Sequence, residues 1–189
     1  MLKHFRPALV LLALFTLLTG LVYPLAMTGI GQAAFSDQAN GSPIVRDGAV
    51  VGSSLIGQQF TRPDYFWGRP SAAGQGYDGR SSSGSNLGPS SRALADRIKA
   101  EAERYGVPAS DIPPDLLTAS ASGLDPHITP AAARFQVARV AKARGLQAEV
   151  VSRLIDAHVE TPSLGFIGEE RVNVLELNLA LDALGRDPA

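Results

Sequence analysis

Three residues of the types that build a nucleophilic hydrolase, Ser122, Asp125 and His127, lie within six positions of one another in the stretch TASASGLDPHITPAAA. A serine nucleophile needs a histidine base and a carboxylate that orients it, and these groups usually converge from separate elements. Here all three fall in one short segment, no G-x-S-x-G turn exposes the serine, and Asp125 precedes a proline that forces an extended backbone. Gly123 permits a sharp turn. We therefore predict a loop of fixed shape, whose side chains hold the loop or touch a neighbouring protein.

Other patterns associated with cofactors lack the structural context that they need. GQGYDG, at 74–79, matches the dinucleotide pattern G-x-G-x-x-G, but no apolar strand leads into it and RSSSGSN after it cannot begin a helix. The chain has no G-K-[ST] phosphate loop and no cysteine, and its histidines do not have metal-ligand spacing. SSSGSNLG, with Ser85 and Asn86, either offers amides and hydroxyls to an anion or packs as a loop. The sequence predicts no catalytic centre, no metal and no directly bound cofactor.

The charge distribution argues against a nucleic-acid partner. Residues 1–35 hold Lys3 and Arg6 and no acid, which leaves 15 basic and 18 acidic side chains in the rest of the 189-residue chain. A weakly acidic body lacks the basic surface that binds phosphate backbones.

An uncharged run predicts how the chain meets a bilayer. Residues 8–27, ALVLLALFTLLTGLVYPLAM, form a helix of about 30 Å, the thickness of a bilayer's hydrocarbon core. We predict a cytoplasmic segment at 1–7, a transmembrane helix at 8–30, a connector at 31–42 and an extracytoplasmic domain at 43–189, since positive charge stays on the cytoplasmic side. The alternative is a signal peptide cleaved near GQA at 31–33, which would release an exported binding protein or hydrolase.

Small residues and a proline mark the predicted transmembrane helix as a packing element. Thr16 with Gly20, and Gly29 with Ala33, form small-xxx-small pairs that let another helix approach closely. Pro24 removes a helical hydrogen bond, so we expect a kink near it.

The body begins with a hairpin signal and a long loop. Asp47-Gly48 predicts a two-residue turn between two short strands. The next stretch carries Tyr65, Phe66, Trp67 and Arg69 and then becomes rich in glycine and serine up to residue 91. A flexible linker would not carry so many aromatic residues, so we interpret this stretch as an ordered loop that packs on the domain.

Helix signals fill the rest of the chain. We predict one helix beginning near Ser90 or Ser91, one capped by Thr129 that ends at Gly145, one over 146–160, and a last one capped by Asn173 that stops at Gly185. Together with the hairpin, they predict an α+β domain with a small sheet and three to four helices.

Six runs, taken in order, resemble the C-subunit family of the bacterial Kdp potassium-transporting ATPases: GQQF, YFWGRPSA, GSNLGP, TASASGLDPHI, RVAKARGL and LGFIGEERVNVLELNLALD. The resemblance covers nearly the whole chain, although SSSGSN is more serine-rich than the family's usual glycine-rich version. It implies a complex with a channel-like potassium-translocating subunit, a P-type ATPase subunit and a small membrane peptide. It also implies an accessory role in assembly, and action as a catalytic chaperone that raises the ATP affinity of the ATPase subunit.

The basic amino terminus and the family resemblance together predict where the chain lies and what it does. A cytoplasmic amino terminus places the body in the periplasm of a bacterium with two membranes, where it cannot meet cytoplasmic ATP. We therefore expect a single-pass inner-membrane protein without chemistry of its own, in a complex whose other subunits handle ATP and potassium. The candidate residues for partner contact or for fixing loop shape are Tyr65, Phe66, Trp67, Arg69, Ser85, Asn86, Ser122, Gly123, Asp125 and His127.

Overall fold

The computed structural model describes residues 2–184, and the chain divides into two compact units between Val51 and Gly52. The predicted stop at Gly185 lies outside the described residues. The mixture of helices and small sheets confirms the predicted α+β class.

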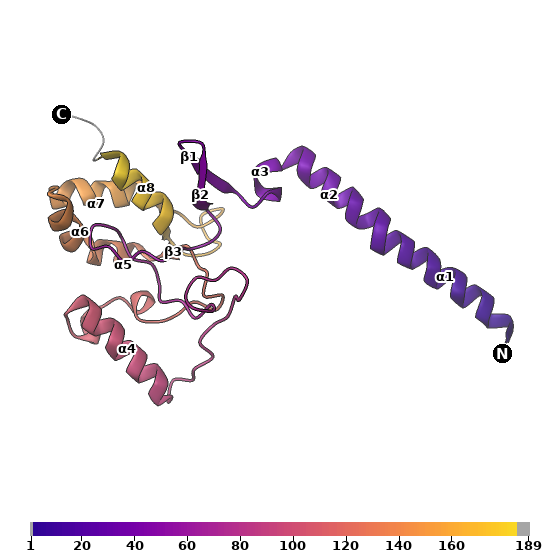
Figure 1. Cartoon of the computed structure of the whole chain (residues 1–189), viewed down its shortest axis with the longest axis horizontal. Coiled ribbons are helices and arrows are strands. Elements are labelled where there is room, and N and C mark those ends of the chain that lie inside the picture. The colour runs from indigo at the N-terminus through magenta and orange to yellow at the C-terminus, as the bar shows by residue number, and fades with distance from the viewer. Residues whose placement is uncertain (1, 185–189) are drawn as a thin grey trace. The chain divides into compact units, whose positions relative to one another are not determined.

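The first unit is dominated by one long helix, drawn in indigo and purple in Figure 1. A 3-10 turn at Leu2–His4 leads into helix α1 (Phe5–Leu17), a π-helical turn (Leu18–Val22) and helix α2 (Tyr23–Ala34). Phe5–Ala34 is thus a continuous helix of 30 residues, long and apolar enough to cross a membrane. It extends beyond the predicted span 8–30 at both ends, and its last turn takes up the beginning of the predicted connector at 31–42.

The expected irregularity near Pro24 is a π-helical turn. Pro24 has no N–H to donate to the carbonyl of Gly20, so the α-helical ladder must break there. The structure shifts the hydrogen bonds by one residue, and the N–H of Tyr23 donates to the carbonyl of Leu18. This i→i+5 bond keeps the helix continuous past the proline.

The predicted hairpin is present. After a short helix α3 (Ser36–Ala39), strands β1 (Pro43–Arg46) and β2 (Ala49–Ser53) pair with each other. Asp47 and Gly48 both have positive φ, 51° and 79°, which a type I′ turn requires at its two central positions.

The second unit contains a sheet that the sequence did not reveal. Strand β5 (Arg171–Asn173) lies between β3 (His127–Ile128) and β4 (Val159–Glu160), and both pairings are antiparallel. In register, His127 faces Asn173 and Glu160 faces Arg171. Strands of two or three residues are too short to show a period-two pattern, so no sequence signal marked them.

Up to residue 184, five helices build the rest of this unit: α4 (Arg92–Tyr105), α5 (Pro130–Phe135), α6 (Val137–Arg144), α7 (Ala148–Ala157) and α8 (Val174–Leu184), with 3-10 turns at Ala109–Asp111 and Pro114–Leu116. Two predicted helices differ from those in the structure. The helix from Thr129 to Gly145 is interrupted at Gln136, and the one over 146–160 ends at Ala157, before strand β4.

The predicted caps are confirmed. The hydroxyl of Thr129 accepts the N–H of Ala132 at 3.1 Å, and the Asn173 side chain accepts the N–H of Leu175 at 3.1 Å. Gly106 and Gly145 end their helices in the left-handed conformation, where a glycine has no steric cost.

The hydrophobic core lies among α5–α8 and the three-stranded sheet (Figure 1). Its large buried side chains come from the long loop, the 3-10 turn Pro114–Leu116, strands β3 and β5, and helices α6, α7 and α8: Phe66, Leu116, Ile128, Val140, Val151, Ile155, Val172, Leu177 and Leu181. Burial of Phe66 shows that the loop before α4 is part of the core.

Candidate functional site

The aromatic segment Tyr65–Phe66–Trp67 is held by two buried amide side chains. Gln136 accepts the N–H of Trp67 at 2.8 Å and donates to its carbonyl at 3.0 Å. Asn178, on α8, does the same for Phe66, at 2.8 and 3.0 Å. Each amide therefore satisfies both backbone polar groups of one residue, as a neighbouring strand would. The loop is fixed in place without belonging to a sheet.

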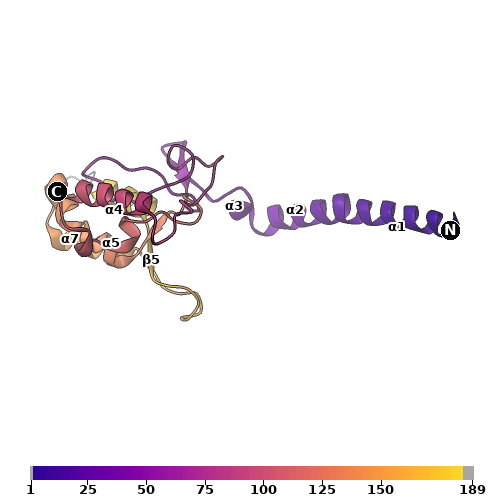
Figure 2. The same cartoon turned by 90° about the horizontal axis from the view of Figure 1, so that it is seen from below.

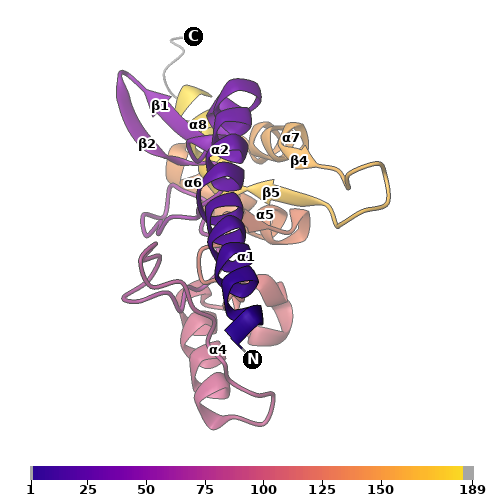
Figure 3. The same cartoon turned by 90° about the vertical axis from the view of Figure 1, so that its right-hand side faces the viewer.

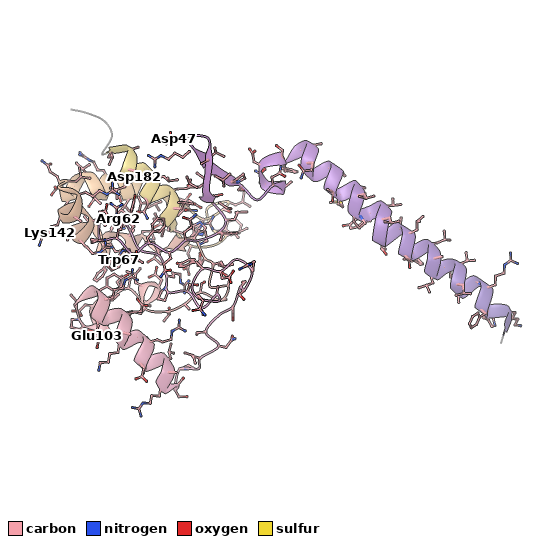
Figure 4. All side chains as sticks on the ribbon, in the orientation of Figure 1. Asp47, Arg62, Trp67, Glu103, Lys142 and Asp182 are labelled. Carbon is pink, nitrogen blue, oxygen red and sulfur yellow. The ribbon has the colours of Figure 1, made fainter. Side chains whose placement is uncertain are left out.

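The Trp67 ring lies between two guanidinium groups. The Cζ atoms of Arg104, on α4, and Arg139, on α6, lie 3.8 and 3.7 Å from the centre of the ring. Trp67 as a residue is only 7% exposed (Figure 4 labels it). The face of an aromatic ring carries negative charge density, which attracts a cation stacked on it. Burial lowers the pKa of Arg139 to about 10 and raises the pKa of the neighbouring Tyr105 to about 12. These cations join α4 to the helices of the core through one tryptophan.

Tyr65 connects the loop to the end of α8. Its hydroxyl donates to the carboxylate of Asp182 at 3.1 Å, and Arg144 bonds the same carboxylate at 2.8 Å. Arg144 also donates to the backbone carbonyl of Asp64 at 2.7 Å. Hydrogen bonds from Arg62 hold the pKa of Asp64 below its usual value. Charged groups thus fix the start of the aromatic segment.

The glycine- and serine-rich stretch is tied to the loop at 118–127. Arg69 forms an ion pair with Asp125 at 3.3 Å, and the hydroxyl of Ser71 donates to the carbonyl of Gly123 at 2.6 Å. Gly123 has a φ of +67°, and a Cβ there would lie 2.6 Å from the carbonyl oxygen of Ser83. Only glycine fits this position, because the two chain segments touch backbone to backbone.

Ser122, Asp125 and His127 do not assemble as a triad. The Ser122 hydroxyl accepts the N–H of Leu124 at 3.1 Å. The His127 ring faces two carboxylates, with Nδ1 3.5 Å from Asp125 and Nε2 3.6 Å from Glu160. Burial raises the pKa of Asp125, but hydrogen bonds from His127 and the charge of Arg69 outweigh it and leave that pKa below its usual value. These contacts fix the shape of the loop at 118–127 and do not form a catalytic triad.

The stretch GQGYDG is a turn, and SSSGSNLG is an irregular loop. At 74–79 the chain reverses through Gly74 and Gly76, both with positive φ, and the N–H of Gly76 donates to the carbonyl of Ala73 at 2.8 Å. The next helix begins only at Arg92. Ser85 accepts the N–H of Leu87 at 3.5 Å, and Asn86 is exposed with a φ of +52°. Within residues 2–184, no group of three or more metal-ligating side chains comes together.

The residues proposed for helix packing lie on the exposed surface of the long helix. Thr16 and Gly20 line a shallow groove of about 650 Å³ between leucine side chains. A Cβ built on Gly20 or Gly29 would meet nothing within 4 Å. Pro24 and Ala33 lie at the two ends of α2.

Sequence reasoning missed the residues that hold the aromatic segment: Arg104, Gln136, Arg139, Arg144 and Asn178. Two of these residues could have been recognised from the sequence. Gln136, at the break between α5 and α6, and Asn178, on α8, are amides with apolar neighbours in the sequence, and a buried amide must have hydrogen-bond partners. The identity of those partners, 69 and 112 residues away, carries no local signal.

The fold and these contacts define a class: a small α+β domain that follows one membrane-compatible helix, with polar side chains that fix loops to helices. The comparisons with known proteins are consistent with that class. The chain belongs to the KdpC family, because the family model described as "K+-transporting ATPase, c chain" matches residues 5–183.

Curated relatives match almost the whole chain. The potassium-transporting ATPase KdpC subunit of Caulobacter vibrioides is 60% identical over 187 residues, which cover 97% of this chain and 94% of the relative. The protein of the same name from Polaromonas naphthalenivorans is 60% identical over 184 residues, covering 95% and 94%. That of Variovorax paradoxus is 59% identical over 183 residues, covering 94% and 95%.

Proposed function

We propose that this chain is a non-catalytic accessory subunit of a high-affinity, ATP-driven potassium uptake complex. The observation that carries the proposal is the match of both the long helix and the body to relatives named as potassium-transporting ATPase KdpC subunits. The local chemistry supports it, because Ser122, Asp125 and His127 are engaged in loop contacts.

The proposed location is the inner membrane of a bacterium. The helix Phe5–Ala34 crosses the bilayer once, and the basic residues Lys3 and Arg6 keep its beginning in the cytoplasm. The α+β body then lies in the periplasm. The small residues Thr16 and Gly20 face a neighbouring helix, which their groove admits closely.

The proposed partners are a channel-like potassium-translocating subunit, a P-type ATPase subunit and a small membrane peptide. The body covers the outer mouth of the channel-like subunit and stabilises the assembly. The buried pairing of Gln136 and Asn178 with the aromatic segment supports this role, because a domain that stabilises partners has to present one rigid surface.

The chain acts on ATP as a catalytic chaperone, raising the ATP affinity of the ATPase subunit through the complex. A periplasmic body has no access to cytoplasmic ATP, so the effect is a coupling between two distant sites. Such coupling is reciprocal: by whatever factor the chain raises ATP affinity, ATP raises the affinity of the assembly for the chain.

Topology and membership test the proposal. A reporter fused after residue 189 is expected to be active in the periplasm, and the intact chain is expected to co-purify with the larger subunits in detergent. A cytoplasmic reporter would overturn the placement. A soluble monomer lacking the first 33 residues would overturn the accessory role in favour of an exported protein.

A further inference from the structure

The connection between β4 and β5 carries the most exposed large apolar side chains described in the second unit. Leu164 is 83% exposed, Phe166 77% and Ile167 53%, and the first two exceed every other large hydrophobic residue described there. Figures 2 and 3 show this loop projecting from the domain beyond β5. Exposed apolar residues are usually scattered singly over a protein surface. Three of them gathered at one projecting tip therefore indicate an interaction site.

The tip of this loop, residues 163–167, has a defined backbone conformation. Ser163 and Ile167 exchange two backbone hydrogen bonds, both 2.9 Å long, and close a small antiparallel bridge. Leu164 and Gly165 turn the chain with positive φ values of 56° and 80°. At the base of the loop, Arg171 and Glu160 form an ion pair at 2.8 Å. A loop that is ordered before binding loses little conformational freedom when it docks.

The charges beside the tip favour a protein partner over a bilayer. Glu169 and Glu170 lie two and three residues after Ile167 and are exposed, and no lysine or arginine occurs between His158 and Glu170. Loops that enter membranes gain from basic flanks, which are attracted to anionic lipids, whereas acidic flanks are repelled. An apolar anchor with an acidic flank is complementary to an apolar pocket with a basic rim.

We propose that residues 163–167 form an anchor, which we call the apolar tip, that inserts into a basic-rimmed apolar pocket on another subunit of the potassium-transporting assembly. This inference rests on the proposed function, since it takes the partner from that assembly. The tip supplies the hydrophobic centre of the contact, and Glu169 with Glu170 supplies its charged rim.

Photo-crosslinking in the full membrane-embedded assembly tests the contact directly. Benzoylphenylalanine replaces Phe166, and a matched control carries it at Leu55, which is 60% exposed. We expect the probe at position 166 to cross-link to another subunit of the assembly, identified by its peptides, and the control to give no cross-link to that peptide. Cross-links to lipid, to a second copy of this chain or to nothing would overturn the proposal.

Substitutions measure the strength of the contact. Phe166→Ser is expected to weaken binding of the full chain to the other subunits by roughly 10- to 100-fold, as for a central anchor residue. The double variant Glu169→Lys/Glu170→Lys is expected to weaken it further at low salt. Leu55→Ser and Glu103→Lys, at an exposed α4 position labelled in Figure 4, serve as controls. Because the tip is exposed, circular dichroism of all variants should match that of the parent chain.

The two proposals fail in different ways. If the parent chain does not co-purify with the other subunits, the proposed function is wrong. If the parent chain co-purifies and Phe166→Ser binds equally well, only the role of the apolar tip is wrong.

Discussion

Replacing Gln136 by leucine is the sharpest test of how the aromatic segment is held. Gln136 is buried, and its amide is paired with the N–H and the carbonyl of Trp67. Leucine has a similar volume, so the substitution creates little cavity but leaves both backbone groups of Trp67 without their partner. Arg139 also loses an acceptor, because it donates to the same amide oxygen.

The expected loss of stability follows from those two backbone groups. A buried polar group left unsatisfied costs about 1–3 kcal/mol, so two of them cost about 2–6 kcal/mol. Domains are typically stable by only about 5–15 kcal/mol, so this is a large fraction of the total. Gln147→Leu is the matched control, because Gln147 is exposed and its side chain does not cap the helix that it precedes.

The assay uses the chain's one tryptophan, which is Trp67 itself. Its fluorescence reports when the ring leaves its place between Arg104 and Arg139. In urea unfolding of the detergent-solubilised full chain, with a slope of about 2 kcal/mol per molar, the midpoint should fall by about 1–3 M for Gln136→Leu. For the control, the free energy of unfolding should change by less than about 0.5 kcal/mol. A change below about 1 kcal/mol for Gln136→Leu would refute the reasoning, since that is the least one unsatisfied group should cost.

Three further predictions concern the loop at 118–127. Gly123→Ala should lower the free energy of unfolding in urea by about 1–3 kcal/mol, because the φ of Gly123 is +67° and a Cβ would lie 2.6 Å from a backbone oxygen. Gly88→Ala is the control, because a Cβ there meets nothing within 4 Å, and it should change the free energy of unfolding little. The pKa of Asp125 is lower in the folded chain than its usual 3.8, so the unfolded chain binds more protons in acid. Stability should therefore fall as the pH drops from about 5 through and below that value, and Asp125→Asn should flatten this acid limb; an unchanged limb would contradict the pairing. Ser122→Ala should leave the ATPase activity of the assembly unchanged, whereas His127→Ala should reduce stability or recovery of the assembly on purification; a hydrolase activity abolished by Ser122→Ala would contradict the structural role of both residues.

The sequence predicted those parts of the fold that depend on neighbouring residues. The Asp47-Gly48 turn and the Thr129 and Asn173 caps are set by residues within a few positions of each other, so their chemistry can be read locally. The α+β class followed from these signals. The three-stranded sheet did not, because its strands have two or three residues and are joined by pairing between distant segments.

The site was predicted only in part, for the same reason. Clustered aromatic residues indicated that the loop around Trp67 packs on the domain, and the structure confirms its burial. The partners that hold it, Gln136 and Asn178, lie far along the chain, and nothing near them identifies what they bind. The break between α5 and α6 at Gln136 was also missed, because helical signals on both sides are continuous in the sequence.

We propose that this chain assists an ATP-driven potassium transporter through the assembly, without chemistry of its own. The most direct test measures the ATP dependence of potassium-stimulated ATP hydrolysis by an assembly lacking the chain, while the purified full chain is added back. We expect the ATP concentration giving half-maximal hydrolysis to fall as the chain is added, and the Ser122→Ala chain to have the same effect. An ATP dependence that stays constant over the whole titration would contradict this role of the chain.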